Sequence, residues 1–355
     1  MIYIILIITL ALANFIKMSD IKKKRLVLVY FIIFTLLATM RGINVGSDTK
    51  YYHNLYTGIG SGRWYYADVE SGLKLLCKIL FNINTNPQIL IIITSIFIYI
   101  CIYNFIIKNS PNILFSTFLF FSLNFFASSL CLMRQFVALS FALIGFEFLK
   151  KNKYIRFIFF VILGSMFHKS VLVLLLLIPV NILSKNKMKK KTMMTILVMV
   201  VVLALAFIAL TPIMFSVAVR LLSYQKYYYS NYINAAPITG GLYTLVNYVF
   251  LLFGIVFYPK SISEDKDYNF YIFTNCIGTL ISAMSIRVAI FSRVFLYFNF
   301  FNIIFIVLGL ENLNNKKMKT VFKILIVIST IIYYFTLKKV DGLGISPYQL
   351  FFLGG

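Results

Sequence analysis

Charged residues are scarce in this chain, and acidic residues are the scarcest of them. Only 10 of the 355 residues are Asp or Glu, and all charged residues together make up 12% of the sequence. Soluble globular domains contain roughly 25% charged residues, so this composition excludes that class. Because 61% of the residues are hydrophobic, the sequence predicts an all-α, polytopic integral membrane helix bundle.

Common catalytic signatures are also missing. The sequence has no phosphate-binding glycine loop and no dinucleotide-binding fingerprint, and no cluster of histidines and carboxylates suggests a required metal. We therefore expect neither a metal nor another cofactor. No internal repeat is visible, which counts against transporter folds built by duplication. The four cysteines show no paired spacing and lie in apolar surroundings, which favours buried thiols over disulfides: Cys77, Cys101, Cys131 and Cys276.

Long apolar runs fill most of the chain and predict about twelve transmembrane helices within a single polytopic domain, 1–355. The segment 71–83 is too short to span a bilayer and carries Lys74 and Lys78, so it is expected to lie at the membrane interface. The predicted spanning helices are 1–17, 26–40, 88–107, 112–132, 135–149, 154–168, 169–184, 192–216, 242–258, 268–286, 288–309 and 320–337.

Lysine-rich clusters give the predicted orientation. They fall in alternate loops, near residues 22–25, 150–156, 185–191 and 316–323. The positive-inside rule assigns these loops to the cytoplasm, so 41–87, 217–241 and both termini are predicted to be extracytoplasmic. A hairpin turning at His168–Ser170 is expected within 154–184, because one long helix would put Lys153 and Lys185 on opposite sides. Orientation and anionic lipid explain these lysines, so no nucleic-acid partner is expected.

Arginine follows a different pattern from lysine. Arg63 and Arg220 adjoin aromatic clusters and are interpreted as interfacial anchors. Arg134, Arg287 and Arg293 interrupt apolar runs, where an unpaired charge costs ~2.5 kcal/mol or more, so each needs a partner or a water-filled cavity. Arginine suits phosphate recognition, so the outward set indicates an anionic ligand. Six of the eight arginines fall outside or toward outer helix ends: Arg41, Arg63, Arg134, Arg220, Arg287 and Arg293.

Two outward groups could accept a proton, Asp48 and His168. Asp48, Tyr52 and Tyr56 recur every four residues, which places them on one face of a helix beginning at Ser47 or Asp48. The helices predicted on both sides of His168 measure only ~22 Å, which is short of a ~30 Å membrane core. The His168 turn is therefore expected at the floor of an outer cavity, with a hydrogen-bonded structural histidine as the alternative. His53 is expected to be incidental, in an exposed loop.

Short polar motifs recur in a fixed order along the chain. They are Arg41, Gly46-Ser47-Asp48 with Tyr52, Glu70-Ser71-Gly72, Met133-Arg134-Gln135, Phe167-His168-Lys169-Ser170, a late arginine-bearing helix, and Ser346-Pro347-Tyr348-Gln349. Taken together, these motifs resemble those of the EpsG family, which are Wzy-type polymerases of bacterial exopolysaccharide, capsule or O-antigen repeat units. The chain departs from that family in having no tryptophan in its later loops, since Trp64 is its only one.

The resemblance implies a multi-pass membrane glycosyltransferase of the bacterial cytoplasmic (inner) membrane. A hydroxyl of one lipid-linked oligosaccharide would attack the anomeric carbon of a chain on another, with lipid diphosphate as the leaving group. The implied partners are an undecaprenyl-diphosphate-type lipid-linked oligosaccharide, membrane lipids and other polysaccharide assembly proteins. A flippase for lipid-linked oligosaccharide, or another secondary transporter, is the alternative. A transporter should place polar residues near mid-bilayer, whereas here they gather at outer helix ends.

Residue roles follow from the resemblance together with the chemistry of each group. His168 is favoured as the catalytic base, because an imidazole accepts a proton near neutral pH and stays neutral beside arginines. Asp48, close in sequence to Arg41, is expected to be the weaker base and to orient Arg41 or a sugar hydroxyl. The predicted substrate-binding residues are Arg41, Arg134, Arg287, Arg293, Tyr52, Glu70 and Gln135.

Overall fold

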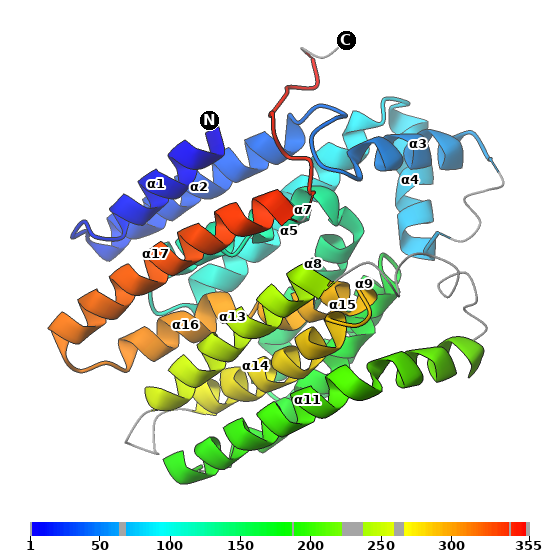
Figure 1. The fold of residues 1–355 in the computed structure, drawn as a ribbon. Helices are drawn as coiled ribbons and strands as arrows, with labels where there is room; N and C mark the ends of the chain where they lie inside the picture. The colour runs from blue at the N-terminus through cyan, green and yellow to red at the C-terminus, as the bar shows by residue number, and fades with distance from the viewer. Residues whose placement is uncertain are drawn as a thin grey trace. The chain divides into compact units, whose positions relative to one another are not determined.

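The computed structural model describes residues 2–63, 69–186, 188–221, 237–258, 266–340 and 342–352. Within these ranges the regular elements are helices, and the one isolated β-bridge joins Arg41 to Leu350. The chain divides into two compact units, Met1–Leu175 with Val327–Gly355, and Leu176–Ile326. Figure 1 shows the course of the chain through its helices.

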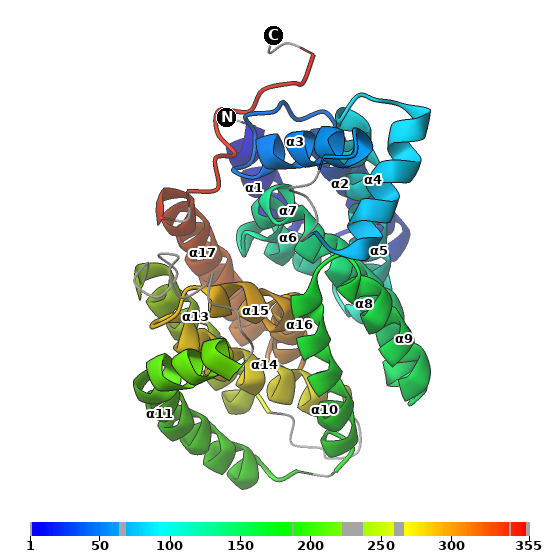
Figure 2. The same ribbon diagram turned by 90° about the vertical axis from the view of Figure 1, so that its right-hand side faces the viewer.

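The first unit contains the N-terminal half of the chain and the C-terminal tail. Its outer loop, predicted over 41–87, contains two helices, α3 and α4, which pack on one another and are seen side by side in Figure 2. The helices are α1 Ile2–Ala13, α2 Asp20–Thr39, α3 Thr49–Gly60, α4 Ser71–Ile83, α5 Gln88–Asn109, α6 Ile113–Ser122, α7 Phe125–Cys131, α8 Met133–Lys150 and α9 Tyr154–Ser165, followed by the 3-10 helix η2 Lys169–Leu176.

The second unit is built around α14, which contacts α10, α11, α13, α15 and α16. Its helices are α10 Leu177–Leu183, α11 Lys190–Leu221, α13 Pro237–Val256, α14 Lys266–Ser285, α15 Ile290–Asn299 and α16 Asn302–Glu311. The last helix, α17 Lys316–Val340, begins in this unit and ends in the first.

Several helices have the length and composition of membrane spans. Among the described residues four qualify singly, in α5, α11, α13 and α17, and up to six spans result if the bent pairs α6–α7 and α15–α16 each count as one. The chain is therefore a multi-pass membrane protein. The predicted number of about twelve spans and the predicted outward orientation of both termini remain predictions.

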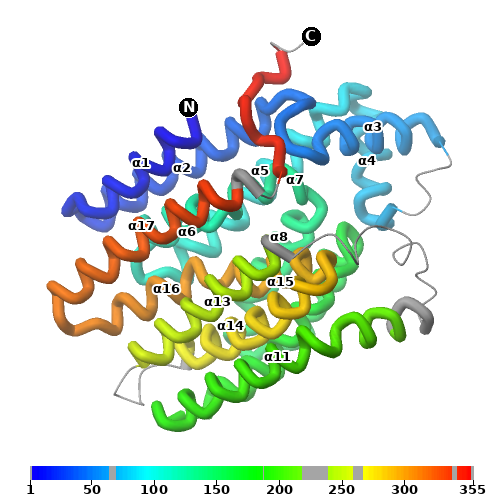
Figure 3. Tube along the Cα trace, viewed as in Figure 1, coloured from blue at the N-terminus to red at the C-terminus, as the bar shows by residue number. Residues whose placement is uncertain are grey.

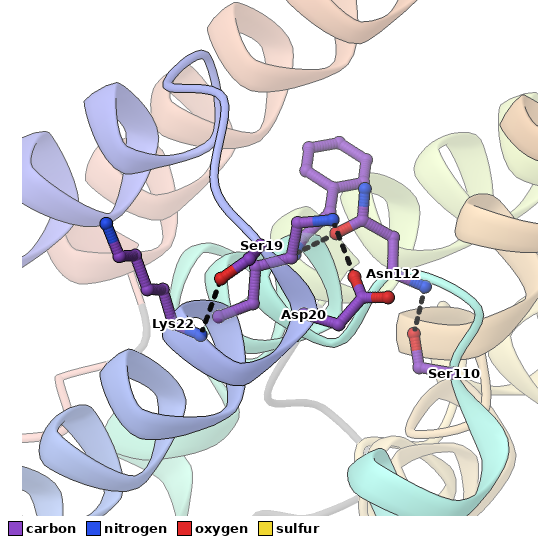
Figure 4. Close-up of polar contacts among 7 residues, drawn as sticks. Ser19, Asp20, Lys22, Ser110 and Asn112 are labelled. Carbon is purple, nitrogen blue, oxygen red and sulfur yellow. Dashed lines mark hydrogen bonds and ion pairs between the residues drawn. The ribbon is translucent and has the colours of Figure 1, made fainter.

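Local sequence explains where α2 and α6 begin. Ser19 caps α2, because its side chain accepts a hydrogen bond from the backbone N–H of Lys22 at 3.4 Å. The negative charge of Asp20 in the first turn also stabilises the helix, because it lies at the positive end of the helix dipole. Asn112 caps α6 in the same way, with its side-chain oxygen accepting the N–H of Phe115 at 3.3 Å. Figure 4 shows both caps, with the hydroxyl of Ser110 accepting the N–H of Asn112.

Two helices that the sequence predicts as continuous are broken. The prediction of one helix over 112–132 is wrong, because Asn124 adopts a left-handed conformation with φ 70° and the pair α6–α7 bends by 54°. Asparagine tolerates that region better than most residues with a side chain. The helix predicted over 288–309 is likewise bent by 40° between α15 and α16.

Buried amides support the second break. The Nδ2 of Asn302 donates to the Oδ1 of Asn247 at 2.6 Å and to that of Asn299 at 2.9 Å. The Nδ2 of Asn275 donates to the Oδ1 of Asn302 at 2.7 Å. Polar groups inside an apolar bundle are costly unless bonded, so this network fixes the register of α13, α14 and the α15–α16 bend.

Candidate functional site

The start of segment 41–87 folds as its polar pattern predicts. Helix α3 starts directly after Asp48, and Tyr52 and Tyr56 are buried on one side of it. The hydroxyl of Tyr56 donates to the carbonyl of Asn84 at 2.5 Å, which ties α3 to the end of α4. At Gly60 a Cβ would lie 2.1 Å from the ring of Phe81, so a glycine is needed where the two helices meet.

The C-terminal tail runs along the segment 40–47. The N–H of Gly42 donates to the carbonyl of Gln349 at 2.8 Å, and the N–H of Ser47 donates to that of Leu343 at 2.9 Å. The red end of the trace in Figure 3 follows this course. The tail and the start of segment 41–87 therefore lie on the same side of the membrane as each other.

Arg41 is enclosed by protein, with only 1% of its surface exposed. Its Nε donates to the hydroxyl of Thr49 at 3.3 Å, and one Nη donates to the carbonyl of Ala38 at 2.6 Å and to Ser95 Oγ at 3.4 Å. The other Nη donates to the carbonyl of Leu130 at 3.2 Å. These protein acceptors already surround the guanidinium of Arg41. Its role as a phosphate ligand stays a prediction.

Arg134 lies in a partly open polar cluster. Its Nη1 donates to Glu70 Oε2 at 2.8 Å, with 22% and 14% of the two side chains exposed. The guanidinium also lies 5.8 Å from the centre of the Tyr51 ring, and its charge acts on the nearby Tyr52 hydroxyl. Sequence reasoning required a partner for this arginine, and the structure supplies Glu70.

One donor of this cluster is left over. In the part of the chain that the structure describes, the buried Nε of Arg134 has no hydrogen-bond acceptor. Burial, opposed by the nearby charge of Arg134, raises the pKa of Tyr52 to about 12. Tyr52 therefore stays a neutral phenol at neutral pH and cannot serve as the base. Gln135, next in the chain, is buried.

His168 lies in the turn after α9. This helix, predicted to extend to 168, ends at Ser165, and η2 begins at Lys169. The ring Nδ1 of His168 is 2.6 Å from the hydroxyl of Ser170. The same turn is fastened to the start of α4, because the N–H of Gly72 donates to the carbonyl of Met166 at 2.8 Å. Glu70 lies two residues before the donor of this hydrogen bond, Gly72, and His168 lies two residues after its acceptor, Met166.

Asp48 and His53 differ in part from expectation. Asp48 is half-buried and accepts a hydrogen bond from the Ser47 hydroxyl at 3.2 Å, and it is not among the hydrogen-bond acceptors of Arg41. The expectation of His53 in an exposed loop is wrong, because it is half-buried on α3. Burial and then the charge of Arg41 lower the pKa of His53, so the ring is neutral at neutral pH.

Two further predicted ligands, Arg287 and Arg293, belong to the second unit. Arg287 is exposed between α14 and α15, and Arg293 is half-buried on α15, both in the second unit. Their convergence with Arg134 therefore stays a prediction. The aromatic residues Trp64, Tyr227, Tyr228, Tyr229 and Tyr232 lie outside the described residues.

Sequence reasoning missed Tyr51, Gln88 and Ser95. Tyr51 had no signal beyond its place beside Tyr52. The polar residues Gln88 and Ser95 interrupt the apolar α5, where a buried polar group needs a partner, and that signal could have paired them with the nearby loop. The amide of Gln88 donates to the carbonyls of Thr39 at 2.7 Å and Arg41 at 3.2 Å.

The four cysteines are free and buried, as predicted. Among the residues with described positions, no group of three or more His, Cys, Asp or Glu side chains could hold a metal ion.

Comparison with protein families gives a match over most of the chain. The model of the EpsG family matches residues 24–350, a range that contains every residue of the candidate site. Comparisons with curated proteins and with solved structures find no significant match.

Proposed function

We propose that this chain, which belongs to the EpsG family of membrane proteins implicated in exopolysaccharide biosynthesis, polymerises oligosaccharide repeat units linked to a lipid diphosphate. The reaction would take place at the outer face of the bacterial cytoplasmic membrane. Its substrate would be an undecaprenyl-diphosphate-type lipid carrying the repeat unit, and no cofactor is required by the proposal.

The cluster around Arg134 carries this proposal. Arg134 lies in the first turn of α8, whose N-terminus has no side-chain cap, so the positive end of the helix dipole and the guanidinium point to the same kind of ligand. Its Nε–H is buried and has no acceptor among the described residues, so a phosphate oxygen that accepts it must enter this partly open cluster. Glu70 holds the guanidinium through Nη1 and does not use that donor.

The bond changes balance without an added reagent. A hydroxyl oxygen of the acceptor sugar bonds to the anomeric carbon of the donor chain, and the bond from that carbon to the diphosphate breaks. The electron pair goes to the phosphate oxygen, where a preorganised arginine stabilises the developing negative charge. The hydroxyl proton goes to a protein base.

His168 is the proposed base. When its Nδ1–H donates to the Ser170 hydroxyl, Nε2 carries the lone pair and can accept the proton. Asp48 is the second candidate for this role, and otherwise it would orient a sugar hydroxyl. Tyr51, 44% exposed beside Arg134, offers a flat ring face to a sugar.

Deleting the gene in its host and separating the surface glycan on a gel tests the proposal. Loss of a polymerase leaves lipid-linked single repeat units displayed, whereas loss of a flippase leaves none displayed. Synthesis of a polymer ladder by the purified protein from lipid-linked repeat units would then establish the reaction. Displayed glycan of normal length in the deletion strain would refute it.

A further inference from the structure

Arg41 is bonded to four separate helices or their ends. Its acceptors are the carbonyl of Ala38 in α2, the hydroxyl of Thr49 in α3, the hydroxyl of Ser95 in α5 and the carbonyl of Leu130 in α7. No other guanidinium in the described part of the chain is so fully enclosed. Such a junction fixes the relative positions of all four elements.

Helix ends compensate the charge of this buried cation. Ala38 lies in the last turn of α2 and Leu130 in the last turn of α7, where carbonyl groups lack partners within the helix. The C-terminal end of a helix carries partial negative charge, so two such ends stabilise the guanidinium without a carboxylate. The arginine thus acts as a shared cap for two helix ends.

The elements that Arg41 joins carry the two halves of the Arg134 cluster. Thr49 is the first residue of α3, two positions before Tyr51, and Leu130 lies four positions before Arg134. Neighbouring residues at the α7–α8 junction are bonded as well: Ser129 to Tyr99 at 2.7 Å, Cys131 to the carbonyl of Leu343 at 3.0 Å, and Met133 to Thr94 at 3.0 Å.

From this arrangement we propose that Arg41 is a positioning residue, which holds the start of α3 against the α7–α8 junction so that Tyr51, Tyr52 and Arg134 form one site. The expected effect of Arg41 on activity rests on the proposed function. A diphosphate would have to displace protein acceptors to reach a side chain that is 1% exposed. Arg41 therefore acts through Arg134 and does not touch the substrate.

A covalent tether separates positioning from ligand binding. The thiol of Cys131 and the backbone N–H of Ser47 donate to the same carbonyl, that of Leu343, at 3.0 Å and 2.9 Å, so the two residues are neighbours. Ser47 precedes α3 and Cys131 ends α7, and a disulfide between Ser47→Cys and Cys131 would join the same elements that Arg41 joins. A disulfide can replace a positioning contact, but it cannot replace a phosphate ligand.

Four matched proteins make up the test: the Ser47→Cys variant, the Arg41→Lys variant, the Arg41→Lys/Ser47→Cys variant, and that double variant with Cys131→Ser. Polymer synthesis in the Arg41→Lys protein should fall by about 100-fold, because a misplacement of about 1 Å has that effect on a catalytic group. Oxidation should restore activity at least about tenfold in the double variant, dithiothreitol should abolish the gain, and the Cys131→Ser protein should show none.

A second measurement does not depend on catalysis. The disulfide should form more slowly in the Arg41→Lys/Ser47→Cys variant than in the Ser47→Cys variant, because the two elements are no longer held together. Equal rates would overturn the inference, and so would a fully formed tether that restores no activity. If wild-type protein makes no polymer, the proposed function fails, while the two rates still decide whether Arg41 holds these elements.

A milder change covers the case in which Arg41→Lys does not fold. Thr49→Ala removes only the acceptor of Nε and leaves the buried charge with its other partners. The tether should restore activity to this variant by the same criterion. Wild-type activity in an untethered Thr49→Ala protein, together with an unchanged disulfide rate, would contradict the positioning role.

Discussion

The N–H of Gly72 donates to the carbonyl oxygen of Met166 at 2.8 Å, and this bond fastens the start of α4 to the turn that carries His168. The contact depends on the missing side chain, because a Cβ on Gly72 would lie 2.8 Å from both the Cβ and the carbonyl oxygen of Met166. Glu70, which pairs with Arg134, precedes Gly72 by two residues, and the proposed base His168 follows Met166 by two. The Gly72–Met166 hydrogen bond therefore anchors both groups.

The first prediction tests this anchor. Gly72→Ala should force the α4 start away from the His168 turn, lower stability by about 1–3 kcal/mol and reduce polymer length. Thermal unfolding of the purified protein and a glycan gel measure the two effects. Gly241→Ala is the matched control, because a Cβ there meets nothing within 4 Å. Equal behaviour of the two variants would show that the anchor does not matter.

The second prediction concerns the fork of Arg134. Arg134→Lys keeps the charge and loses the planar set of donors, so polymer synthesis should fall by about 100-fold while the protein still inserts. Polymer synthesis should fall further in the Arg134→Ala variant. Arg63→Lys, at an exposed arginine of segment 41–87, should keep full activity in the same assay. Polymer of full length from both Arg134 variants would remove this residue from the site.

The third prediction concerns topology. Residues 41–87 are predicted outside and 185–191 inside, and the structure offers exposed positions in each, Ser61 and Lys189. In a protein without its native cysteines, Ser61→Cys should react with an impermeant thiol reagent in intact cells, and Lys189→Cys should react only after permeabilisation. The opposite pattern would invert the orientation and place the proposed site in the cytoplasm.

Much of the helix pattern could be predicted from the sequence, because apolar runs and the polar turns between them are local signals. The start of α3 at Thr49 follows from the spacing of Asp48, Tyr52 and Tyr56. The break at Asn124 was missed because one asparagine barely interrupts an apolar run, and its left-handed backbone depends on surrounding packing.

The fate of each arginine could not be predicted from local sequence. Arg41 and Arg134 both follow apolar runs, yet one is enclosed and the other faces a partly open cluster. The difference arises from distant residues, since Leu130 and Ser95 accept bonds from Arg41 while Glu70 pairs with Arg134. The pairing of the tail with segment 40–47 is equally remote in sequence.

The fourth prediction is a pH dependence of stability. The pKa of His53 in the folded protein is lowered by burial and by Arg41, with the Gln88 amide opposing this, whereas the unfolded chain has a pKa of ~6.5. The unfolded state therefore takes up the proton first, and stability falls as the pH drops through ~6.5. Wild-type protein should lose more thermal stability between about pH 7.5 and 5.5 than His53→Gln, which has no ring to protonate. Equal losses would contradict this.

The last prediction assigns the proton acceptor. His168→Ala should abolish polymerisation while membrane abundance stays normal, because it removes the group that takes the hydroxyl proton. Asp48→Asn should leave measurable activity, since the carboxylate is proposed to orient and not to accept the proton. His53→Gln, the same class of change at the other histidine, is the control and should retain activity. Ser170→Ala should lower the rate and shift its pH profile, because the hydroxyl that orients Nδ1 is lost. Normal polymer from a stably expressed His168→Ala protein would transfer the base role to Asp48 or indicate a mechanism without a protein base.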